Sequence, residues 1–185
     1  MKLSILIPTL ISRVSQFSNL LAELSSQKND NVEIVWSSDD GTKSIGEKRN
    51  ELIARAKGEY ICFIDDDDEV SRNYVALILK ALEFNPTHCS LKGLYTVDGK
   101  AASIFHHSTI YKEYKTNTND QAIKYERYPN HLNVIRKDIA AKYSFVPINH
   151  GEDTEWATQL LKGGELTTEA NIKEVLYYYK YKSDK

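Results

Sequence analysis

The hydrophobic positions in the first half of the chain form two alternating kinds of segment. Continuous apolar runs of strand length occupy residues 3–7, 32–36 and 60–64. Each run is followed by apolar residues at helical spacing, over 14–27, 45–56 and 71–85. Ser71 is expected to cap the third helix. This β-α-β-α-β-α order with short connections predicts a parallel sheet with helices packed on its faces.

The pattern changes after Pro86. Two apolar runs within 91–104 flank Asp98-Gly99 and predict a β-hairpin. The rest of the chain predicts a polar loop, a short strand, two helices and a closing aromatic strand, over 112–120, 131–135, 137–143, 151–161 and 175–181. We therefore expect one domain over 1–185, with a nucleotide-binding α/β half at 1–86 and a mixed half at 87–185 that holds a second substrate.

Composition narrows the class of protein. The 185 residues are 41% hydrophobic and 27% charged, with a net charge of −2, so no basic surface for nucleic acid is expected. No run approaches the ~18 apolar residues of a transmembrane segment. Two cysteines, Cys62 and Cys89, do not make a disulfide framework and indicate free thiols in a reducing compartment. We expect a soluble, cytoplasmic protein.

The most unusual stretch is 58–70, GEYICFIDDDDEV, where an apolar strand meets four aspartates and a glutamate. Adjacent carboxylates repel one another, and a hard divalent cation that bridges to phosphate oxygens would offset the repulsion. In open α/β sheets the ligand crevice lies beyond the carboxyl ends of the strands, where these aspartates are expected. The alternative is a solvated acidic turn, which the preceding buried strand disfavours.

Four stretches in order resemble a known family: SILIPTL (4–10), IVWSSDDGTKS (34–44), RNELIARAKGEYICFIDDDDEV (49–70) and GEDTEWATQLL (151–161). Together they resemble the family-2 type of GT-A glycosyltransferase, which uses nucleotide-diphosphate sugars. The resemblance implies a Rossmann-like, three-layer α/β/α fold with a mainly parallel central sheet and a smaller mixed C-terminal part. It also implies that 1–86 binds the nucleotide-sugar and that 87–185 binds the acceptor.

The resemblance carries roles to individual residues. Residues that match nucleotide-sugar positions are Pro8, Thr9, Asp39, Asp40, Lys48, Arg49, Asp65 and Asp66. Asp39 or Asp40 would contact the base, and the choice between them stays open. Asp67 matches the direct ligand of Mn²⁺ or Mg²⁺, and Asp65 lies nearer the ribose or the metal waters. Asp68 matches a frequent third aspartate.

The second acidic site supplies the catalytic residues that the resemblance implies. Asp153 matches the general base and Glu152 its supporting neighbour. A positioned carboxylate that takes the proton of an acceptor hydroxyl contributes roughly 10²–10⁴-fold in rate. An inverting mechanism follows if Asp153 is the base. Each role has a structural alternative: Glu152 and Asp153 could complement the helix dipole, Asp39-Asp40-Gly41 could be a generic turn, and Arg49 could be a surface residue.

One departure from the family concerns histidine. Many relatives supply a late histidine as a further metal ligand, but 177–181 contains none. The remaining candidates are His88, His106, His107, His131 and His150, of which His150 is as suited to the acceptor as to metal. Trp156 is expected in the core and Trp36 could touch a base. The tyrosines of 177–179 are expected to alternate between sheet faces and not to form a stacking surface.

Substrate identity is predicted only coarsely. A UDP-sugar is favoured as donor and a GDP-sugar is the main rival, whereas the acceptor is a glycan or another hydroxyl compound. A nucleotidyltransferase would normally show a glycine-rich loop after the first strand, which IPTLISRVS lacks. A non-catalytic module that binds sugar-nucleotide or Ca²⁺ is the other alternative, although the contiguous aspartates do not have EF-hand spacing.

Overall fold

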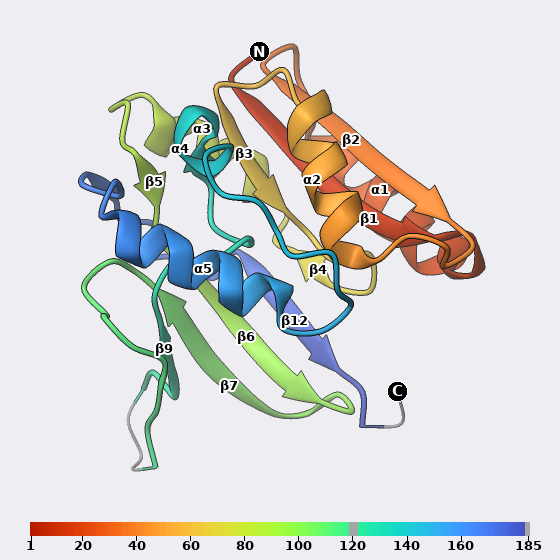
Figure 1. The fold of residues 1–185 in the computed structure, drawn as a ribbon. Coiled ribbons are helices and arrows are strands. Elements are labelled where there is room, and N and C mark those ends of the chain that lie inside the picture. The colour runs from red at the N-terminus through yellow and green to blue at the C-terminus, as the bar shows by residue number, and fades with distance from the viewer. Residues whose placement is uncertain (119–121, 184–185) are drawn as a thin grey trace.

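The first of two six-stranded sheets forms the centre of the fold in the computed structural model, which describes residues 1–118 and 122–183 (Figure 1). In sheet order its strands are β11 (Glu169–Ala170), β5 (His88–Cys89), β10 (Ile135–Arg136), β3 (Tyr60–Phe63), β1 (Leu3–Leu10) and β2 (Val32–Asp39). β1 pairs in parallel with β2 and β3, and β10 pairs antiparallel with β3. The sheet is therefore parallel at its centre and mixed towards β11.

Helices cover both faces of this sheet. One face packs against α1 (Val14–Gln27) and α3 (Tyr74–Leu82), and the other against α2 (Ile45–Arg55), α4 (Lys137–Ala140) and α5 (Glu152–Gly163). Strand β1 is buried on both sides because Ile5 and Ile7 join the α1–α3 core while Leu6 joins the α2–α5 core. Figure 1 shows α2 in front of the sheet and α1 behind it. This arrangement is the predicted α/β/α layering.

A second sheet extends the α1–α3 core. In sheet order its strands are β4 (Glu69–Val70), β12 (Tyr177–Tyr181), β6 (Leu91–Val97), β7 (Lys100–His107), β9 (Tyr125–Arg127) and β8 (Lys115–Thr116). β6 and β7 form the predicted hairpin, with positive φ at Asp98 (50°) and Gly99 (73°) in its turn. Strand β4 comes directly after the aspartate run, so this sheet begins where the central sheet ends.

Three sequence expectations differ from the structure. Ser71 does not cap α3, which begins at Tyr74 after Asn73; the Ser71 hydroxyl is buried without a hydrogen-bond partner. The strand expected over 131–135 is reduced to Ile135–Arg136, because the preceding residues form a buried turn. Within the expected loop 112–120, residues 115 and 116 pair as β8, and residues 119 and 120 lie outside the described residues.

Both cysteines belong to the core of the protein. Cys62 and Cys89 are both free and buried, and burial raises the pKa of each thiol to about 12. Thiols with such pKa values stay protonated and act as small core residues.

Within residues 1–118 and 122–183, no helix has both the length and the apolar character needed to cross a bilayer.

Candidate active site

Two buried basic side chains on α2 face the carboxyl ends of the central strands. The helix begins with a capping box in which Ser44 and Glu47 satisfy each other's backbone N–H groups. Gly46 lies against the loop before α5, where an added Cβ would sit 1.9 Å from the Val146 carbonyl oxygen. This close approach brings the first turns of α2 next to the segment that carries Glu152 and Asp153.

Lys48 joins the ends of β1 and β2. Its Nζ donates to the Thr9 carbonyl oxygen at 2.9 Å and to Asp39 Oδ1 at 2.7 Å. The hydrogen bond from Lys48 lowers the pKa of Asp39 to about 2, more than partial burial raises it, and the Lys43 backbone N–H adds to the lowering. Asp39 is therefore a fixed carboxylate, whereas Asp40 is exposed.

Asp66 holds the aspartate run in place through contacts with Thr9 and Arg13. Its side chain is 2% exposed and accepts a hydrogen bond from Thr9 Oγ1 at 2.6 Å and from Arg13 Nη1 at 2.9 Å. Arg13 Nη1 also lies 3.8 Å from Asp67 Oδ2. Sequence reasoning did not single out Arg13, because it lies just before α1 and shares no motif with the aspartates.

Arg49 connects the two acidic sites. Its Nη2 donates to Asp65 Oδ1 at 2.9 Å, and its Nη1 lies 3.4 Å from Glu152 Oε1. The guanidinium lies 5.5 Å from the ring centres of both Phe63 and Phe145. Nε and Nη1 are buried without a hydrogen-bond partner. The alternative that Arg49 is a surface residue is wrong, since it is 2% exposed.

Asp68 occupies a different environment from Asp65. It accepts hydrogen bonds from the Tyr177 hydroxyl (2.8 Å) and the Lys180 backbone N–H (2.9 Å). Burial raises the pKa of Asp68 to about 7, and the charges of Asp65 and Asp66 add to the rise. Burial also disfavours the Asp65 anion, but the charges of Arg49 and His131 outweigh it, so the pKa of Asp65 is lowered. Burial therefore favours the protonated form of Asp68, whereas nearby positive charges favour the anionic form of Asp65.

Within the aspartate run, the Asp67 side chain is more exposed than those of Asp66 and Asp68 and less exposed than that of Asp65. Its side chain is 16% exposed and faces a hollow of about 590 Å³ that Asp66, Asp68 and Glu69 also line. No set of three or more His, Cys, Asp or Glu side chains within the described ranges is grouped to hold a metal ion. A Mg²⁺ or Mn²⁺ ion bound together with phosphates needs only one or two carboxylates. Asp67 supplies one such carboxylate in this hollow, whereas the Asp65 carboxylate lies towards Arg49 and His131.

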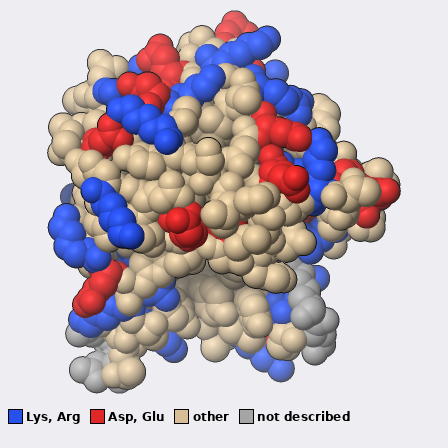
Figure 2. Space-filling view, viewed as in Figure 1, with Lys and Arg blue, Asp and Glu red and all other residues tan. Residues whose placement is uncertain are grey.

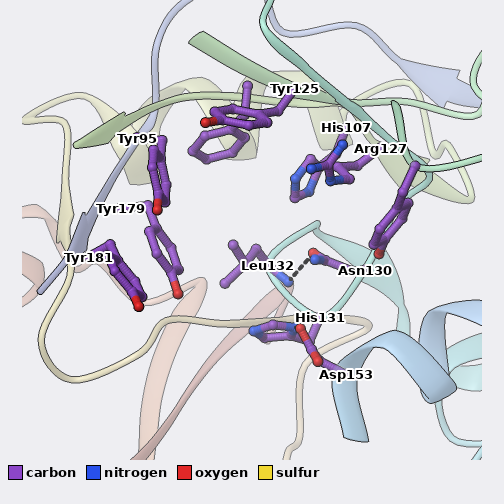
Figure 3. A pocket seen from close by; sticks show the side chains of 12 residues that line it. Tyr95, His107, Tyr125, Arg127, Asn130, His131, Leu132, Asp153, Tyr179 and Tyr181 are labelled. Carbon is purple, nitrogen blue, oxygen red and sulfur yellow. Dashed lines mark hydrogen bonds and ion pairs between the residues drawn. The ribbon is translucent and has the colours of Figure 1, made fainter. Parts of the chain in front are cut away.

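His131 lies between the two acidic sites. Its Nε2 is 3.7 Å from Asp65 Oδ2 and its Nδ1 is 3.7 Å from Asp153 Oδ2. The ring is 5% exposed, and neither nitrogen has a hydrogen-bond partner in the part of the chain that the structure describes. Asp153 Oδ1 accepts the Thr154 backbone N–H at 2.8 Å, which leaves Oδ2 towards His131 (Figure 3). His131, and not the exposed His150, is therefore the histidine beside Asp153.

A cavity of about 410 Å³ opens from Asp153 towards the second sheet. Its lining is mainly aromatic: Tyr95, Phe105, His107, Tyr114, Tyr125, Arg127, Asn130, His131, Leu132, Asp153, Tyr179 and Tyr181 (Figure 3). The tyrosines of β12 alternate between faces, as expected. Tyr177 is buried in the core and Tyr179 lines this cavity. Tyr179 stacks on Tyr95 with ring centres 5.4 Å apart and planes 18° apart.

The structure brings most of the predicted site residues to one place. Thr9, Asp39, Lys48, Arg49, Asp65, Asp66 and Glu152 are joined by the contacts above, and Asp153 is joined through His131. Pro8 is buried in β1 opposite Ser37. Trp156 is in the core, stacked on Phe145 at 4.8 Å, whereas Trp36 is 45% exposed beside Phe17.

Comparison with solved structures supports this architecture. The crystal structure of S. aureus TarS 1-349 matches with a TM-score of 0.73 at 16% identity, over 97% of this chain and 60% of that one. Its complex with UDP matches with a TM-score of 0.73 at 17% identity and the same coverage. Its complex with UDP-GlcNAc matches with a TM-score of 0.72 at 16% identity, over 97% and 58%. At these identities the likeness shows the fold.

Comparison at the level of sequence identifies the family. The chain spans about three fifths of the length of the TarS fragment. No curated protein matches the sequence significantly. The model of the family described as "Glycosyl transferase family 2" matches residues 18–144, which is more than half of the chain. Together with the two-sheet α/β architecture, these findings confirm the GT-A fold class, and the chain belongs to glycosyl transferase family 2.

Proposed function

We propose that this chain is the catalytic domain of a metal-dependent glycosyltransferase. It transfers a sugar from a nucleotide-diphosphate donor, with a UDP-sugar favoured, to the hydroxyl of a glycan or a similar acceptor. The observation that carries the proposal is the position of His131, with Asp65 and Asp153 each 3.7 Å from its ring. A donor-side carboxylate and a candidate base thus lie on either side of one buried histidine.

The donor half is assigned to residues 1–86. Thr9, Asp39 and Lys48 would line the nucleotide pocket together with Pro8. Asp39 or Asp40 would contact the base, and the exposed Trp36 could touch it as well. Arg49 Nε and Nη1 have no hydrogen-bond partner among the described residues, although Nη1 lies 3.4 Å from Glu152 Oε1, and a guanidinium with spare hydrogen-bond donors suits the oxygens of a diphosphate. UDP is favoured over GDP because a solved structure of the same fold is described in complex with UDP and another with UDP-GlcNAc.

Asp67 and Asp65 would hold a Mn²⁺ or Mg²⁺ ion, with Asp66 behind them as a structural anchor. Such an ion supplies Lewis-acid stabilisation of the charge that develops on the leaving diphosphate. The chain's own cations, Lys48 and Arg49, add electrostatic stabilisation on the same side. Asp66 is already paired with Thr9 and Arg13, which suits it to hold the loop rather than the ion.

The acceptor half is assigned to residues 87–185, with Asp153 as the general base. Asp153 would accept the proton of the acceptor hydroxyl while that oxygen bonds to the anomeric carbon and the bond to the diphosphate breaks. Attack from the side opposite the leaving group inverts the anomeric centre. Glu152 would act indirectly, because it is 4% exposed and faces Arg49 rather than the cavity.

The first experiment is calorimetric titration of UDP and of GDP into the wild-type protein and Asp67→Ala, each with Mn²⁺ and with EDTA. We expect UDP to bind only with metal and to lose most of its affinity in Asp67→Ala. Asp30→Ala, which removes an exposed carboxylate from a distant turn, is the matched control. Failure of both nucleotides to bind the wild-type protein under any condition would contradict the proposal.

Product formation separates the enzyme from the alternatives. A panel of UDP-sugars with mixed acceptors should give transfer that depends on Asp153. A non-catalytic sugar-nucleotide module would bind UDP but release no UDP from any donor. A nucleotidyltransferase would release pyrophosphate from a nucleoside triphosphate, and that outcome would replace the present assignment.

A further inference from the structure

The face of the second sheet that borders Asp153 carries a row of stacked tyrosines. Tyr95 of β6 stacks with both Tyr179 and Tyr181 of β12, with ring centres 5.4 and 6.2 Å away and planes 18° and 27° apart. Tyr125 of β9 meets Tyr95 edge-on at 5.3 Å. We call Tyr95, Tyr179 and Tyr181 the tyrosine wall. Figure 3 shows it on one side of the cavity, with His131 and Asp153 on another.

Strand register builds this wall. Tyr179 lies opposite Tyr95 in the parallel β6–β12 pair, and residues two apart on a strand share a face. Tyr177, on the same face, is fully buried in the core, so the row begins inside the protein and continues into the cavity. At Gly93 an added Cβ would sit 2.2 Å from the Phe105 ring, so only glycine leaves room for the aromatic packing beneath the wall.

The cavity has little net charge of its own. Among the described residues that line it, the fixed charges are one arginine, Arg127, and one carboxylate, Asp153. Arg127 Nη1 donates to the carbonyl oxygens of Lys115 and Glu126, and its guanidinium lies 5.0 and 5.3 Å from the rings of Tyr114 and Tyr125. This arginine therefore supports the aromatic lining. A polyanionic acceptor would need several free basic groups, which this lining does not offer.

The cavity's size and rim also restrict its occupant. A volume of about 410 Å³ lies within the ~300–1,000 Å³ of small-molecule sites. Figure 2 shows a hollow below α5, over the strands of the second sheet, bordered mainly by side chains that are neither acidic nor basic. Tyr181 is 46% exposed at this rim, so part of the wall is open to an entering ligand.

We propose that the tyrosine wall is the acceptor subsite and that it takes an uncharged pyranose ring. The proposal rests on the proposed function, since Asp153 is the base that the bound hydroxyl would meet. The C–H face of a pyranose is apolar and packs on an aromatic ring, while its equatorial hydroxyls remain free to point along the cavity. A ring stacked on Tyr179 would extend towards Asp153, which lines the same cavity.

The test uses saturation-transfer NMR with two sets of probes: methyl glycosides of neutral hexoses and their β-linked disaccharides, and glycerol phosphate as an anionic polyol. We expect signal transfer to the neutral pyranosides and none to glycerol phosphate. Tyr181→Ala and Tyr179→Ala should weaken pyranoside binding by about fivefold to tenfold, whereas Tyr179→Phe should retain it because the ring remains. Tyr178→Ala, on the opposite face of β12, is the matched control and should bind normally.

UDP titration of every variant separates this proposal from the proposed function. Tyr179→Ala and Tyr181→Ala should bind UDP as the wild type does. If wild type binds no nucleotide but the pyranosides still need the wall, the donor assignment fails and the saccharide subsite stands. Unchanged pyranoside binding in Tyr181→Ala and Tyr179→Ala, binding of glycerol phosphate alone, or pyranoside binding that UDP-sugar displaces one for one would overturn the acceptor subsite.

Discussion

The two sides of the proposed site are built in different ways. On the proposed donor side, Asp39, Lys48, Arg49, Asp65 and Asp66 form a cluster, here called the donor cluster, in which each charge already has a partner inside the protein. On the proposed acceptor side, the rings of the tyrosine wall stack on one another, and its outer residue, Tyr181, is nearly half exposed. The donor cluster is thus preorganised by ion pairs, whereas the tyrosine wall keeps surface for a ligand.

This difference matches what each substrate demands. A diphosphate carries charge that must be met by fixed, desolvated groups, because such groups need no reorganisation during the reaction. A neutral ring is held by contact area and shape, which exposed aromatic faces supply without desolvating charges. Strand β12 serves both sides, since Tyr177 binds Asp68 while Tyr179 and Tyr181 face the cavity. Substitutions on the two sides should therefore give different signatures.

The largest expected effect is on the catalytic rate and concerns Asp153, between the donor cluster and the tyrosine wall. Asp153→Asn should lower kcat by roughly 10²–10⁴-fold, because the amide cannot take the acceptor proton. UDP affinity should stay within a factor of about two, since the donor cluster is intact. Steady-state kinetics and calorimetry measure the two quantities. Glu155→Gln, an exposed change on the same helix, is the control; a similar loss of rate there would point to a helix effect instead.

The next effect is on stability of the donor side. Arg49→Met should lower the free energy of unfolding by about 3–5 kcal/mol, because Asp65 and the buried Glu152 lose their shared cation. UDP binding should disappear as well. Urea denaturation with and without the compensating change Glu152→Gln checks the cause. If the double variant is no more stable than Arg49→Met alone, uncompensated charge at Glu152 is not the reason.

A smaller effect concerns pH. Since burial raises the pKa of Asp68 to about 7, the folded state holds this proton more tightly than the unfolded chain does. The contribution of Asp68 to the free energy of unfolding is therefore fully present below about pH 4, the ordinary pKa of aspartate, and is lost as the pH rises to about 7. Asp68→Asn should remove this decline, so that the free energy of unfolding falls less between pH 5 and pH 8 than it does in the wild type. Denaturation curves at pH 5 and pH 8 measure it; a larger decline in Asp68→Asn would contradict the assignment.

The smallest effect is expected on the tyrosine wall. Tyr181→Ala should change the free energy of unfolding by less than about 0.5 kcal/mol, because its ring is at the exposed rim. Thermal unfolding of Tyr181→Ala beside Arg49→Met gives the sharpest form of the comparison. A stability loss at Tyr181 as large as that at Arg49 would mean that the wall is a structural element rather than open binding surface.

Sequence patterns predicted the parts of the protein that are local in the chain. The helix over 14–27 has the predicted bounds, and the strands at 3–10, 32–39 and 60–63 lie where apolar runs place them. The aspartate run and the Glu-Asp pair could be singled out because each is a short contiguous motif. Their roles in binding and catalysis stay predictions. The capping role of Ser71 failed because the chain pairs with Leu176 at that point, which delays the helix.

Other parts of the site depended on contacts between distant segments. Arg13 reaches Asp66 from the start of α1, and His131 reaches both Asp65 and Asp153 from a turn before β10. Nothing in the spacing of the sequence links these residues, because each pair is joined by the order of strands in the central sheet. The signal that could have found His131 is weak: a polar turn directly before a short buried strand that ends beside the aspartates.

The sequence by itself determined the layered α/β fold, the family and the position of the acidic motifs, because periodicity and motifs are properties of neighbouring residues. Only the tertiary structure decided that Tyr95, Tyr179 and Tyr181 stack in one wall, and that one histidine lies between the two acidic sites. The physical reason is strand register. A shift of one residue between β6 and β12 would turn the tyrosines to the opposite face, and register is set by packing across the whole sheet.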